Sequence, residues 1–207
     1  MKSLWLVSGS LLLAGIVSAQ EVPRFTFNAG AGFTQPVGGT SRRLNNGWNF
    51  DVGAGVNLHS HIGAMVQFNF NDLGVNTNTL NNLGYPDGSV RLWSLTLNPV
   101  VHLNPNGPVD VYFIGGGGLY HFTQEFTQPA LQTVFGFDPF FGPFTTQIPV
   151  DQVLSSYTVN KPGVNGGMGL SFGTKWKGKV YAEARYHRVI FGDRHVDLVP
   201  VTFGFRW

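Results

Sequence analysis

The last nine residues of the chain alternate strictly between apolar and polar or small side chains. Apolar or aromatic residues occupy every second position from Val199 to Trp207, and Pro200, Thr202, Gly204 and Arg206 stand between them. Successive side chains of a β-strand point to opposite faces, so this segment has one oily face and one polar face. Its length is that of a strand that crosses a bilayer at a tilt, about 9–11 residues. The pattern predicts a transmembrane β-strand.

The same alternation recurs upstream. Seven further strands are expected at residues 24–33, 48–58, 62–70, 90–103, 109–122, 164–172 and 179–187. Pro99 interrupts the fourth and predicts a bulge or local break there, and Gly115–Gly118 hide the two faces of the fifth. No oily face that can be assigned carries a charge. A bilayer enforces this, because an Arg or Lys facing lipid at mid-membrane costs about 2–4 kcal/mol.

The composition also indicates a membrane environment. Charged residues make up 12% of the chain and aromatic residues 14%, whereas soluble domains carry about 25% charged residues. Alternation alone would also fit a soluble β-sandwich, but the low charge and the aromatic residues at the strand ends favour lipid. The fold class predicted is therefore all-β: a transmembrane eight-stranded antiparallel up-and-down β-barrel, which satisfies its backbone hydrogen bonds within the bilayer.

The first residues resemble a secretory signal peptide. Lys2 precedes an apolar run from Leu4 to Ile16, and Val17-Ser18-Ala19 is a cleavage site of small residues. We expect a signal peptide at residues 1–19 and the barrel at residues 20–207. Cysteine is absent, which excludes a disulfide framework. The 13 basic and 11 acidic residues nearly balance, so nothing favours nucleic acid as a partner.

The connections between the expected strands alternate in length. Short links are expected at residues 59–61, 104–108 and 175–178, and long links at about 34–47, 71–89, 123–162 and 188–195. Outer-membrane barrels have short periplasmic turns and longer outer loops. This predicts four outer loops and two periplasmic chain ends.

Two segments carry a resemblance to a known family. The terminal Phe203-Gly-Phe205-Arg-Trp207 and the segment from Val180 to His187 resemble the small eight-stranded outer-membrane barrels typified by the OmpA transmembrane domain and OmpX. The resemblance implies an outer-membrane location and contact with outer-membrane lipid and lipopolysaccharide. It also implies that Phe203, Phe205 and Trp207 form the signal read by the barrel-assembly machinery.

Five ionisable residues are expected to point into the barrel lumen: Asp51, Glu183, Arg185, His187 and Arg206. An eight-stranded barrel is just wide enough for side chains to fill it, and buried charges must pair. Arg185 with Glu183 or Asp51 is the preferred pair. One interpretation is a structural polar core that plugs the barrel, and the other is a small gated pore.

The third long link contains an unusually aromatic stretch from Val134 to Phe144. Its phenylalanines are Phe135, Phe137, Phe140, Phe141 and Phe144. Exposed apolar patches of this kind mark contacts. The stretch could fold down as a lid on the barrel mouth, dip into the outer-leaflet interface, or present a surface to a partner or hydrophobic ligand. Residues 150–157 are expected to form a short helix.

Catalytic and metal-binding motifs are weak. A lipid A deacylase of this size needs His and Ser two residues apart on one strand, and no His-x-Ser occurs. His59 and His61 sit in an expected turn, which suits a solvated pair better than a metal site. The sequence therefore predicts no enzyme, no cofactor and no metal. The main hypothesis is a structural and surface-interacting barrel with an unidentified surface partner, and the alternative is a small gated pore or a carrier of hydrophobic molecules.

Overall fold

The computed structural model describes residues 24–173 and 178–207. The expected signal peptide and most of the link at residues 175–178 lie outside these ranges. In chain order the elements are β1 (Phe25–Pro36), the 3-10 helix η1 (Thr40–Arg42), β2 (Leu44–His59), β3 (Ile62–Val75), α1 (Thr77–Leu83), β4 (Asp87–His102), β5 (Val109–Asp138), β6 (Gly142–Gly173), β7 (Lys179–Phe191) and β8 (Arg194–Arg206).

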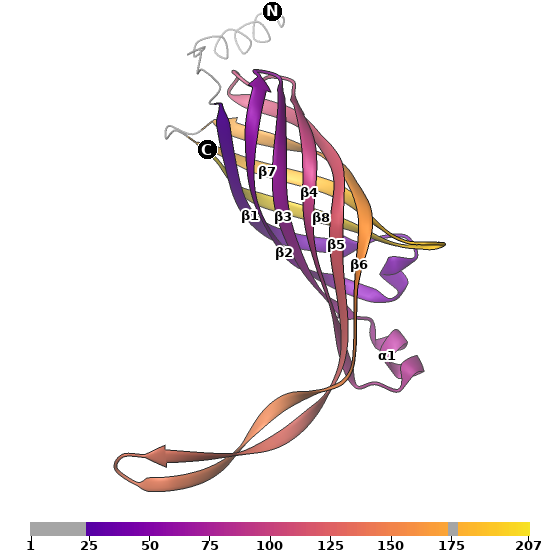
Figure 1. Cartoon of the computed structure of the whole chain (residues 1–207), viewed down its shortest axis with the longest axis vertical. Coiled ribbons are helices and arrows are strands. Elements are labelled where there is room, and N and C mark those ends of the chain that lie inside the picture. The colour runs from indigo at the N-terminus through magenta and orange to yellow at the C-terminus, as the bar shows by residue number, and fades with distance from the viewer. Residues whose placement is uncertain (1–23, 174–177) are drawn as a thin grey trace, which may run out of the picture.

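The eight strands form a closed barrel in which each strand pairs with its sequence neighbours (Figure 1). Every pairing is antiparallel, including the pairing of β1 with β8 that closes the ring. Trp207 and Phe27 exchange two backbone hydrogen bonds of 2.9 and 2.8 Å at this seam. The predicted eight-stranded up-and-down barrel is confirmed.

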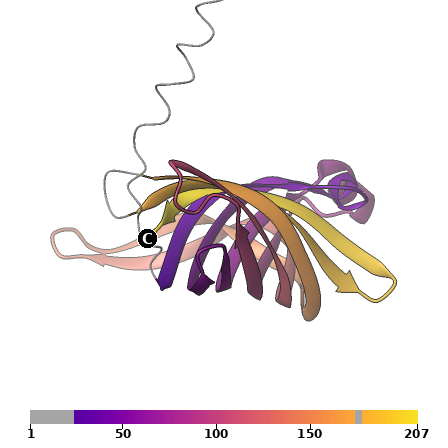
Figure 2. The same ribbon diagram turned by 90° about the horizontal axis from the view of Figure 1, so that it is seen from above.

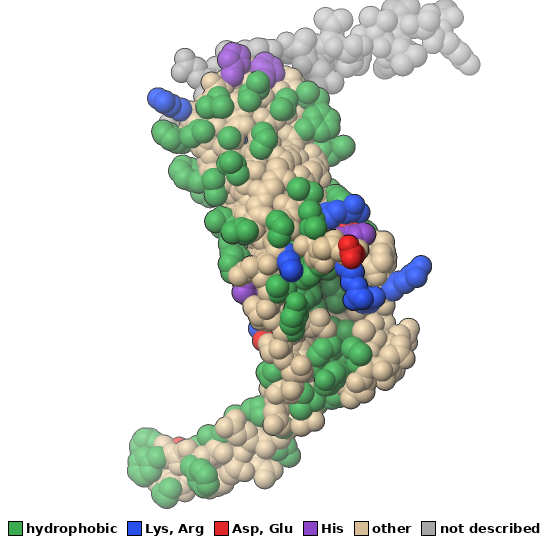
Figure 3. All heavy atoms as spheres, turned by 45° about the vertical axis from the view of Figure 1, so that its right-hand side comes forward, with side chains coloured by type: hydrophobic (Ala, Val, Ile, Leu, Met, Phe, Trp, Pro, Cys, Tyr) green, Lys and Arg blue, Asp and Glu red, His purple; other side chains and the backbone are tan. Residues whose placement is uncertain are grey.

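The outer wall of the barrel is apolar. Large side chains that are at least one third exposed cover it, among them Phe25, Phe27, Phe33, Trp48, Val52, Val66, Trp93, Leu95, Leu97, Phe113, Leu119, Met168, Leu170, Phe203, Phe205 and Trp207. They alternate along the strands with buried residues, as the two-residue period requires. We call this surface the lipid belt. Hydrophobic side chains cover the barrel wall in Figure 3.

Several strands continue past the belt at the end of the barrel where the long connections lie, which we call the loop end. The largest difference from expectation is the third long link. Residues 123–162 are mostly strand, because β5 and β6 extend together as one long hairpin. The helix expected at residues 150–157 is wrong, since this segment belongs to β6.

The second long link holds the short helix α1, for which the sequence pattern gives no expectation. Asn76 caps its first turn by accepting a hydrogen bond of 2.9 Å from the backbone N–H of Asn78, and Gly84 ends it at φ 74°. Leu80 is its buried residue, and it ties the helix to the barrel interior. None of the helices described is long and apolar enough to cross a membrane.

Of the expected bulge or local break at Pro99, no bulge forms, but the pairing of β4 with β5 is interrupted, because neither Asn98 nor Pro99 has a paired residue on β5. Leu97 lies opposite Gly117 and Val100 opposite Ile114, so the register between β4 and β5 is the same on both sides of the proline. The side chain of Pro99 is on the exposed outer face of the barrel, so the pyrrolidine ring takes up no space in the lumen.

The glycine run that obscures the faces of β5 reflects close approach of neighbouring backbones. A Cβ on Gly116 would lie 2.0 Å from the carbonyl oxygen of Leu97, and one on Gly118 would lie 2.0 Å from that of Leu95. Any side chain at these two inward positions would collide with β4. Small residues here permit the tight curvature of a narrow barrel.

Candidate functional site

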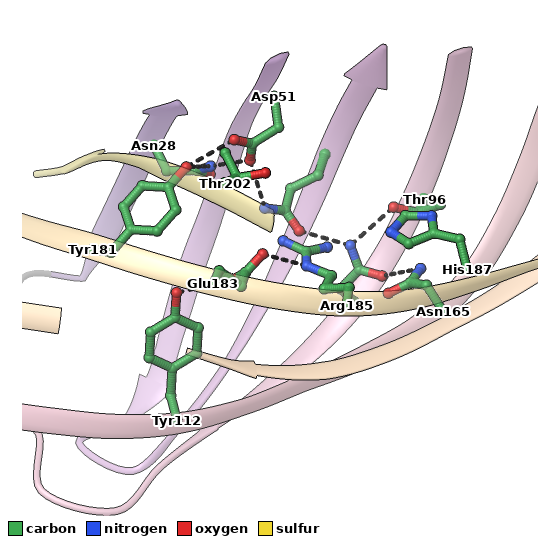
Figure 4. A network of polar contacts seen from close by, with 12 residues as sticks. Asn28, Asp51, Thr96, Tyr112, Asn165, Tyr181, Glu183, Arg185, His187 and Thr202 are labelled. Carbon is green, nitrogen blue, oxygen red and sulfur yellow. Dashed lines mark hydrogen bonds and ion pairs between the residues drawn. The ribbon is translucent and has the colours of Figure 1, made fainter. Parts of the chain in front are cut away.

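All five ionisable residues expected in the lumen point inward in the structure. Asp51 comes from β2, Glu183, Arg185 and His187 from β7, and Arg206 from β8. None is more than 7% exposed. Asp51, Glu183, Arg185 and His187 lie among polar side chains from the surrounding strands, and together we call them the polar network (Figure 4).

Glu183 balances the two arginines of the lumen. It forms an ion pair with Arg185 through Nε, accepts a hydrogen bond of 2.9 Å from the hydroxyl of Tyr112, and lies 3.8 Å from Arg206. Arg185 is thus paired with Glu183 rather than with Asp51. Because both arginines lie against this one buried carboxylate, loss of the Glu183 charge would leave two buried cations without a counter-ion.

Asp51 is held by neutral donors. The hydroxyl of Tyr181 donates to it at 2.8 Å, and the amides of Asn28 and Gln67 donate at 2.6 and 3.4 Å. These donors reach it from β1, β3 and β7, so the network crosses the full width of the lumen. Gly30 leaves the space for this crossing, since a Cβ there would lie 2.4 Å from the hydroxyl oxygen of Tyr181.

Arg206 is stabilised by aromatic rings as well as by charge. Its guanidinium carbon lies 4.3 Å from the ring centre of Tyr112 and 5.3 Å from that of Tyr181. Within the described part of the chain its side-chain nitrogens have no hydrogen-bond partner. Cation–π contacts are strongest where water is excluded. The rings of Tyr112 and Tyr181 therefore stabilise the buried charge of Arg206, for which the sequence predicts no partner.

His187 contacts Tyr120 and is 3% exposed. Its Nδ1 lies 3.0 Å from the hydroxyl oxygen of Tyr120, and the two rings meet edge to face at 5.8 Å. Within residues 24–173 and 178–207, no group of three or more His, Asp and Glu side chains is placed to hold a metal ion.

Above the polar network, at the loop end, the lumen is apolar. We call this group the apolar seal. It consists of Leu44, Leu73, Val75, Leu80, Val90, Leu92, Tyr120, Phe122, Val189 and Leu198, all at most 8% exposed. The members come from β2, β3, β4, β5, β7 and β8 and from α1, so they meet across the barrel rather than along one wall.

The seal forms where the inward face of a strand changes from polar to apolar and its outward face from apolar to polar, at the end of the lipid belt. Along β4, Ser94 and Thr96 point inward beside the outward Trp93 and Leu95, whereas further on Leu92 is buried and Arg91 is exposed. The direction of the side chains continues unchanged. Only the surroundings of the outer face differ, lipid along the belt and water beyond it.

The extended part of the β5–β6 hairpin forms a two-stranded arm. The last pair between β4 and β5 is Asp87 with Thr127, and beyond it β5 pairs only with β6, as far as Asp138 opposite Gly142. Leu154 is an extra residue in β6 at the base of the arm, where Thr127 pairs with Val153 and Phe126 with Ser155. Such a bulge bends and twists a ribbon, and the arm leaves the barrel wall and reaches beyond the outline of the ring (Figures 1 and 2).

The expected loop phenylalanines lie at the tip of this arm. Their exposed fractions are 81% for Phe135, 74% for Phe137, 91% for Phe140, 91% for Phe141 and 50% for Phe144. The tip is remote from the barrel mouth in Figure 1. The tip therefore does not cover the mouth as a lid in this structure, and the buried side chains nearest the loop end are those of the apolar seal.

Comparisons with known proteins identify the family. The sequence profile described as "Outer membrane protein beta-barrel domain" matches residues 8–206. The chain belongs to this family. Its location is therefore the outer membrane, and the lipid belt is the surface that meets that membrane. No curated protein sequence matches the chain significantly.

Solved structures of other outer-membrane barrels share the fold. Neisserial surface protein A is 14% identical with a TM-score of 0.57, covering 89% of this chain and 96% of its own. A major outer membrane protein of Thermus thermophilus is 12% identical with a TM-score of 0.58, covering 88% and 97%. The attachment invasion locus protein Ail of Yersinia pestis is 18% identical with a TM-score of 0.50, covering 89% and 100%. At these identities the similarity concerns the fold alone.

Beyond the belt of this family member, the outer surface carries charged clusters. Near the β7–β8 turn, Arg188 donates to Asp197 at 2.9 Å, His195 lies 3.2 Å from the same carboxylate, and the Asp197 backbone N–H donates to the hydroxyl of Thr40. Burial alone would raise the pKa of Asp197, but the hydrogen bond and charge of Arg188 hold it below its ordinary value. Figure 3 shows charged side chains gathered on the barrel between its hydrophobic wall and the arm.

A groove of about 460 Å³ lies at the base of the arm. Its lining includes the carboxylates of Asp72, Asp87, Glu125 and Asp151 together with Arg91. Arg91 lies 3.4 Å from Glu125. The same lining includes Leu73, a member of the apolar seal.

Proposed function

We propose that this protein is a sealed outer-membrane anchor that carries a β arm outward and presents the phenylalanine tip of the arm as a contact surface. The observation that supports this most strongly is the apolar seal. A barrel whose mouth is filled by packed hydrophobic side chains suits display better than transport.

The lumen beneath the seal supports the same assignment. Tyr112, Tyr120 and Tyr181 are each at most 1% exposed and reach into the polar network. A pore through this barrel would have to displace both an apolar layer and a network of ion pairs. Removing the arm would do neither, because the tip does not cover the mouth.

The proposed role is not catalytic. His102 and His195 contact carboxylates, at 2.6 Å from Asp110 and 3.2 Å from Asp197, and neither histidine lies in the lumen network. His187 does lie in the lumen, but it is buried and its Nδ1 contacts Tyr120. A substrate in the outer leaflet would not reach it without opening the barrel. The charged groups Glu183 and Arg185 satisfy each other and serve the stability of the lumen.

Three further parts of the proposal concern the membrane and assembly. The lipid belt contacts outer-membrane lipid, and the charged surface above it lies where lipopolysaccharide head groups are. Phe203, Phe205 and Trp207 are more than half exposed on the outer face, an arrangement open to recognition by the barrel-assembly machinery. The remaining surface, above all the arm, is free for a partner outside the cell.

Conductance in planar bilayers tests the sealed barrel. We expect no conducting steps from the wild-type protein and none after deletion of residues 130–145. Replacing Leu92 and Phe122 by serine together with Glu183→Ala and Arg185→Ala introduces space into both the seal and the ion-pair network beneath it, and we expect steps to appear. The matched control replaces Leu95 and Leu119, which face lipid, by serine and should stay silent. Wild-type steps that vanish on deleting residues 130–145 would instead establish the gated pore.

Display of the arm has its own test. Chymotrypsin added to intact cells should cut the protein within residues 130–145, because the tip phenylalanines are exposed, and should leave the barrel in one piece. An uncut protein on intact cells, with cleavage only after lysis, would show that the arm does not face outward.

A further inference from the structure

The tip of the arm exposes an apolar surface on every side. Phe135 and Phe137 belong to one face of the ribbon and Phe144 to the other, while Phe140 and Phe141 occupy the turn between the strands. A protein partner that docks on one face would leave the other phenylalanines in water. An apolar phase that surrounds the tip would bury all of them.

We propose that this tip inserts into the surface of a second, electrically neutral lipid bilayer that faces the membrane holding the barrel. The proposal rests on the display function above and names the class of partner: phospholipid without net charge. Hydrophobic contact is the driving force, since buried apolar area is what stabilises such insertion.

The backbone of the turn is prepared for an apolar environment. The carboxylate of Asp138 accepts hydrogen bonds from the backbone N–H groups of Phe140 and Phe141 at 2.8 and 3.0 Å. Pro139 has no N–H to satisfy, and Gly142 closes the turn at φ 83°. Unpaired backbone groups are costly in lipid, so the engaged donors lower the polar cost of the turn, while the charged carboxylate of Asp138 limits insertion to the level of the lipid head groups.

The charges of the arm favour a neutral surface. Between residues 126 and 160 the only charged side chains are Asp138 and Asp151, and the nearest cation along the chain is Lys161. Proteins bind anionic lipid through clusters of Lys and Arg. An arm with two carboxylates and no cation is repelled by anionic lipid. Neutral lipid does not repel it, so the phenylalanines can insert.

The direction of the arm decides which bilayer the tip meets. From Thr127 to Asp138 the ribbon extends roughly 37 Å at about 3.4 Å per residue. It leaves the end of the barrel and then turns to the side, and its hydrophobic end lies far from the hydrophobic wall of the barrel (Figures 1 and 3). The bilayer that the tip reaches is thus a separate one.

The chain contains no cysteine, so a single introduced thiol can be labelled cleanly. The test uses the mature protein with Phe140→Cys, labelled with the environment-sensitive dye NBD and held in a phosphatidylcholine nanodisc. Phosphatidylcholine vesicles, or vesicles with one third phosphatidylglycerol, are then added. We expect a blue shift and an intensity gain of severalfold with the neutral vesicles and a weaker response with the anionic ones. Nitroxide-labelled lipid should quench the dye from the vesicles but not from the nanodisc.

Matched variants locate the effect at the tip. Thr133→Cys places the dye on the shaft of the arm and should not respond. Adding Phe141→Ser to Phe140→Cys should weaken vesicle binding about tenfold or more, because one buried phenylalanine is lost. Adding Leu131→Ser, which removes a comparably exposed apolar side chain from the shaft, should leave binding nearly unchanged.

Three results would overturn the inference: no response to any vesicle, quenching from the nanodisc itself, or a response that depends on protein concentration without vesicles. The last would identify a second copy of this chain as the partner. None of these results alters the conductance and protease tests, so failure of the lipid inference is distinguishable from failure of the display function. A protein that conducts, or whose arm is shielded on cells, would refute the display function first.

Discussion

Replacing Glu183 by glutamine tests whether the lumen is a dry, charge-paired core. The substitution keeps the size of the side chain and an oxygen that can accept from Arg185, but it removes the negative charge that faces Arg185 and Arg206. Breaking a buried ion pair by removing one partner costs about 3–5 kcal/mol. Because one hydrogen bond to Arg185 survives, we expect the lower end, about 3 kcal/mol, which corresponds to a change of roughly 150-fold in the unfolding equilibrium.

The assay is reversible urea unfolding of the barrel in lipid vesicles, followed by tryptophan fluorescence and by the gel mobility of the folded form. With a urea dependence of about 2 kcal/mol per molar, the midpoint of Glu183→Gln should fall by about 1.5 M. The control is Thr123→Ala, which removes a hydroxyl that pairs with Thr158 on the exposed surface and should change the free energy of unfolding by less than about 0.5 kcal/mol.

A double variant separates pairing from simple loss of a residue. If Glu183 and Arg185 interact as the structure shows, Arg185→Gln added to Glu183→Gln should cost much less than the sum of the single variants. A Glu183→Gln protein within about 0.5 kcal/mol of the wild type would refute the reasoning. It would mean that water solvates these charges, as in an open lumen.

Two further predictions concern the wall and the outer surface. Gly167→Ala should prevent stable folding, because its Cβ would lie 2.1 Å from the carbonyl oxygen of Ala184, whereas Gly166→Ala should fold normally because nothing lies within 4 Å of that position; heat-modifiable gel mobility distinguishes folded from unfolded barrels, and equal behaviour of both variants would contradict this. Asp197 has a lowered pKa, so its ion pair with Arg188 stabilises the folded state above the ordinary carboxyl pKa of about 3.9 and is lost as the pH falls through the lower folded value. The protection factor for hydrogen exchange of the amides in the β7–β8 turn should therefore stay constant from pH 7 to 5 and fall only below pH 4. A fall of the protection factor near pH 5 to 6 would contradict the assignment.

The barrel and the direction of its side chains can be predicted from the sequence because both depend on a local, two-residue period. Asp51 and Glu183 are assigned to the lumen simply because they alternate with apolar neighbours. Their partners are not predictable in the same way. Which side chains meet across a lumen depends on the stagger of the strands, and this has no local signal.

Tyr112 shows a second limit. It donates to Glu183 and packs on Arg206, yet the run from Gly115 to Gly118 conceals which face of its strand it occupies. The glycines that obscure the pattern are required by the same narrow curvature that brings Tyr112 close to these charges. Where the strands curve most strongly, glycine replaces larger residues, and the alternation of apolar and polar side chains is hardest to detect in the sequence.

The arm is absent from the sequence-based expectations although its turn has a clear signal. Asp138-Pro139 followed by Gly142 is typical of a hairpin turn, with Asp accepting from the backbone and Gly supplying a positive φ. The flanking segments mix Phe, Thr and Gln without one oily face, because both sides of a free ribbon meet the same surroundings. Strict alternation is a sign of two different environments, and its absence does not exclude a strand.

The exchange of chemistry at the end of the belt links the seal to the membrane boundary. A strand that passes from lipid into water keeps its side-chain directions, so the face that was oily becomes polar and the inward face is left to hold the apolar residues. Leu92 and Phe122 are buried inside the barrel for this reason, and on the proposed function they close it without a loop folded over the mouth. The barrel can therefore be sealed by its own walls while β5 and β6 continue outward. On the proposed function, sealing and display are independent, so opening the seal together with the ion-pair network is expected to give a conducting path and deletion of the arm tip is not.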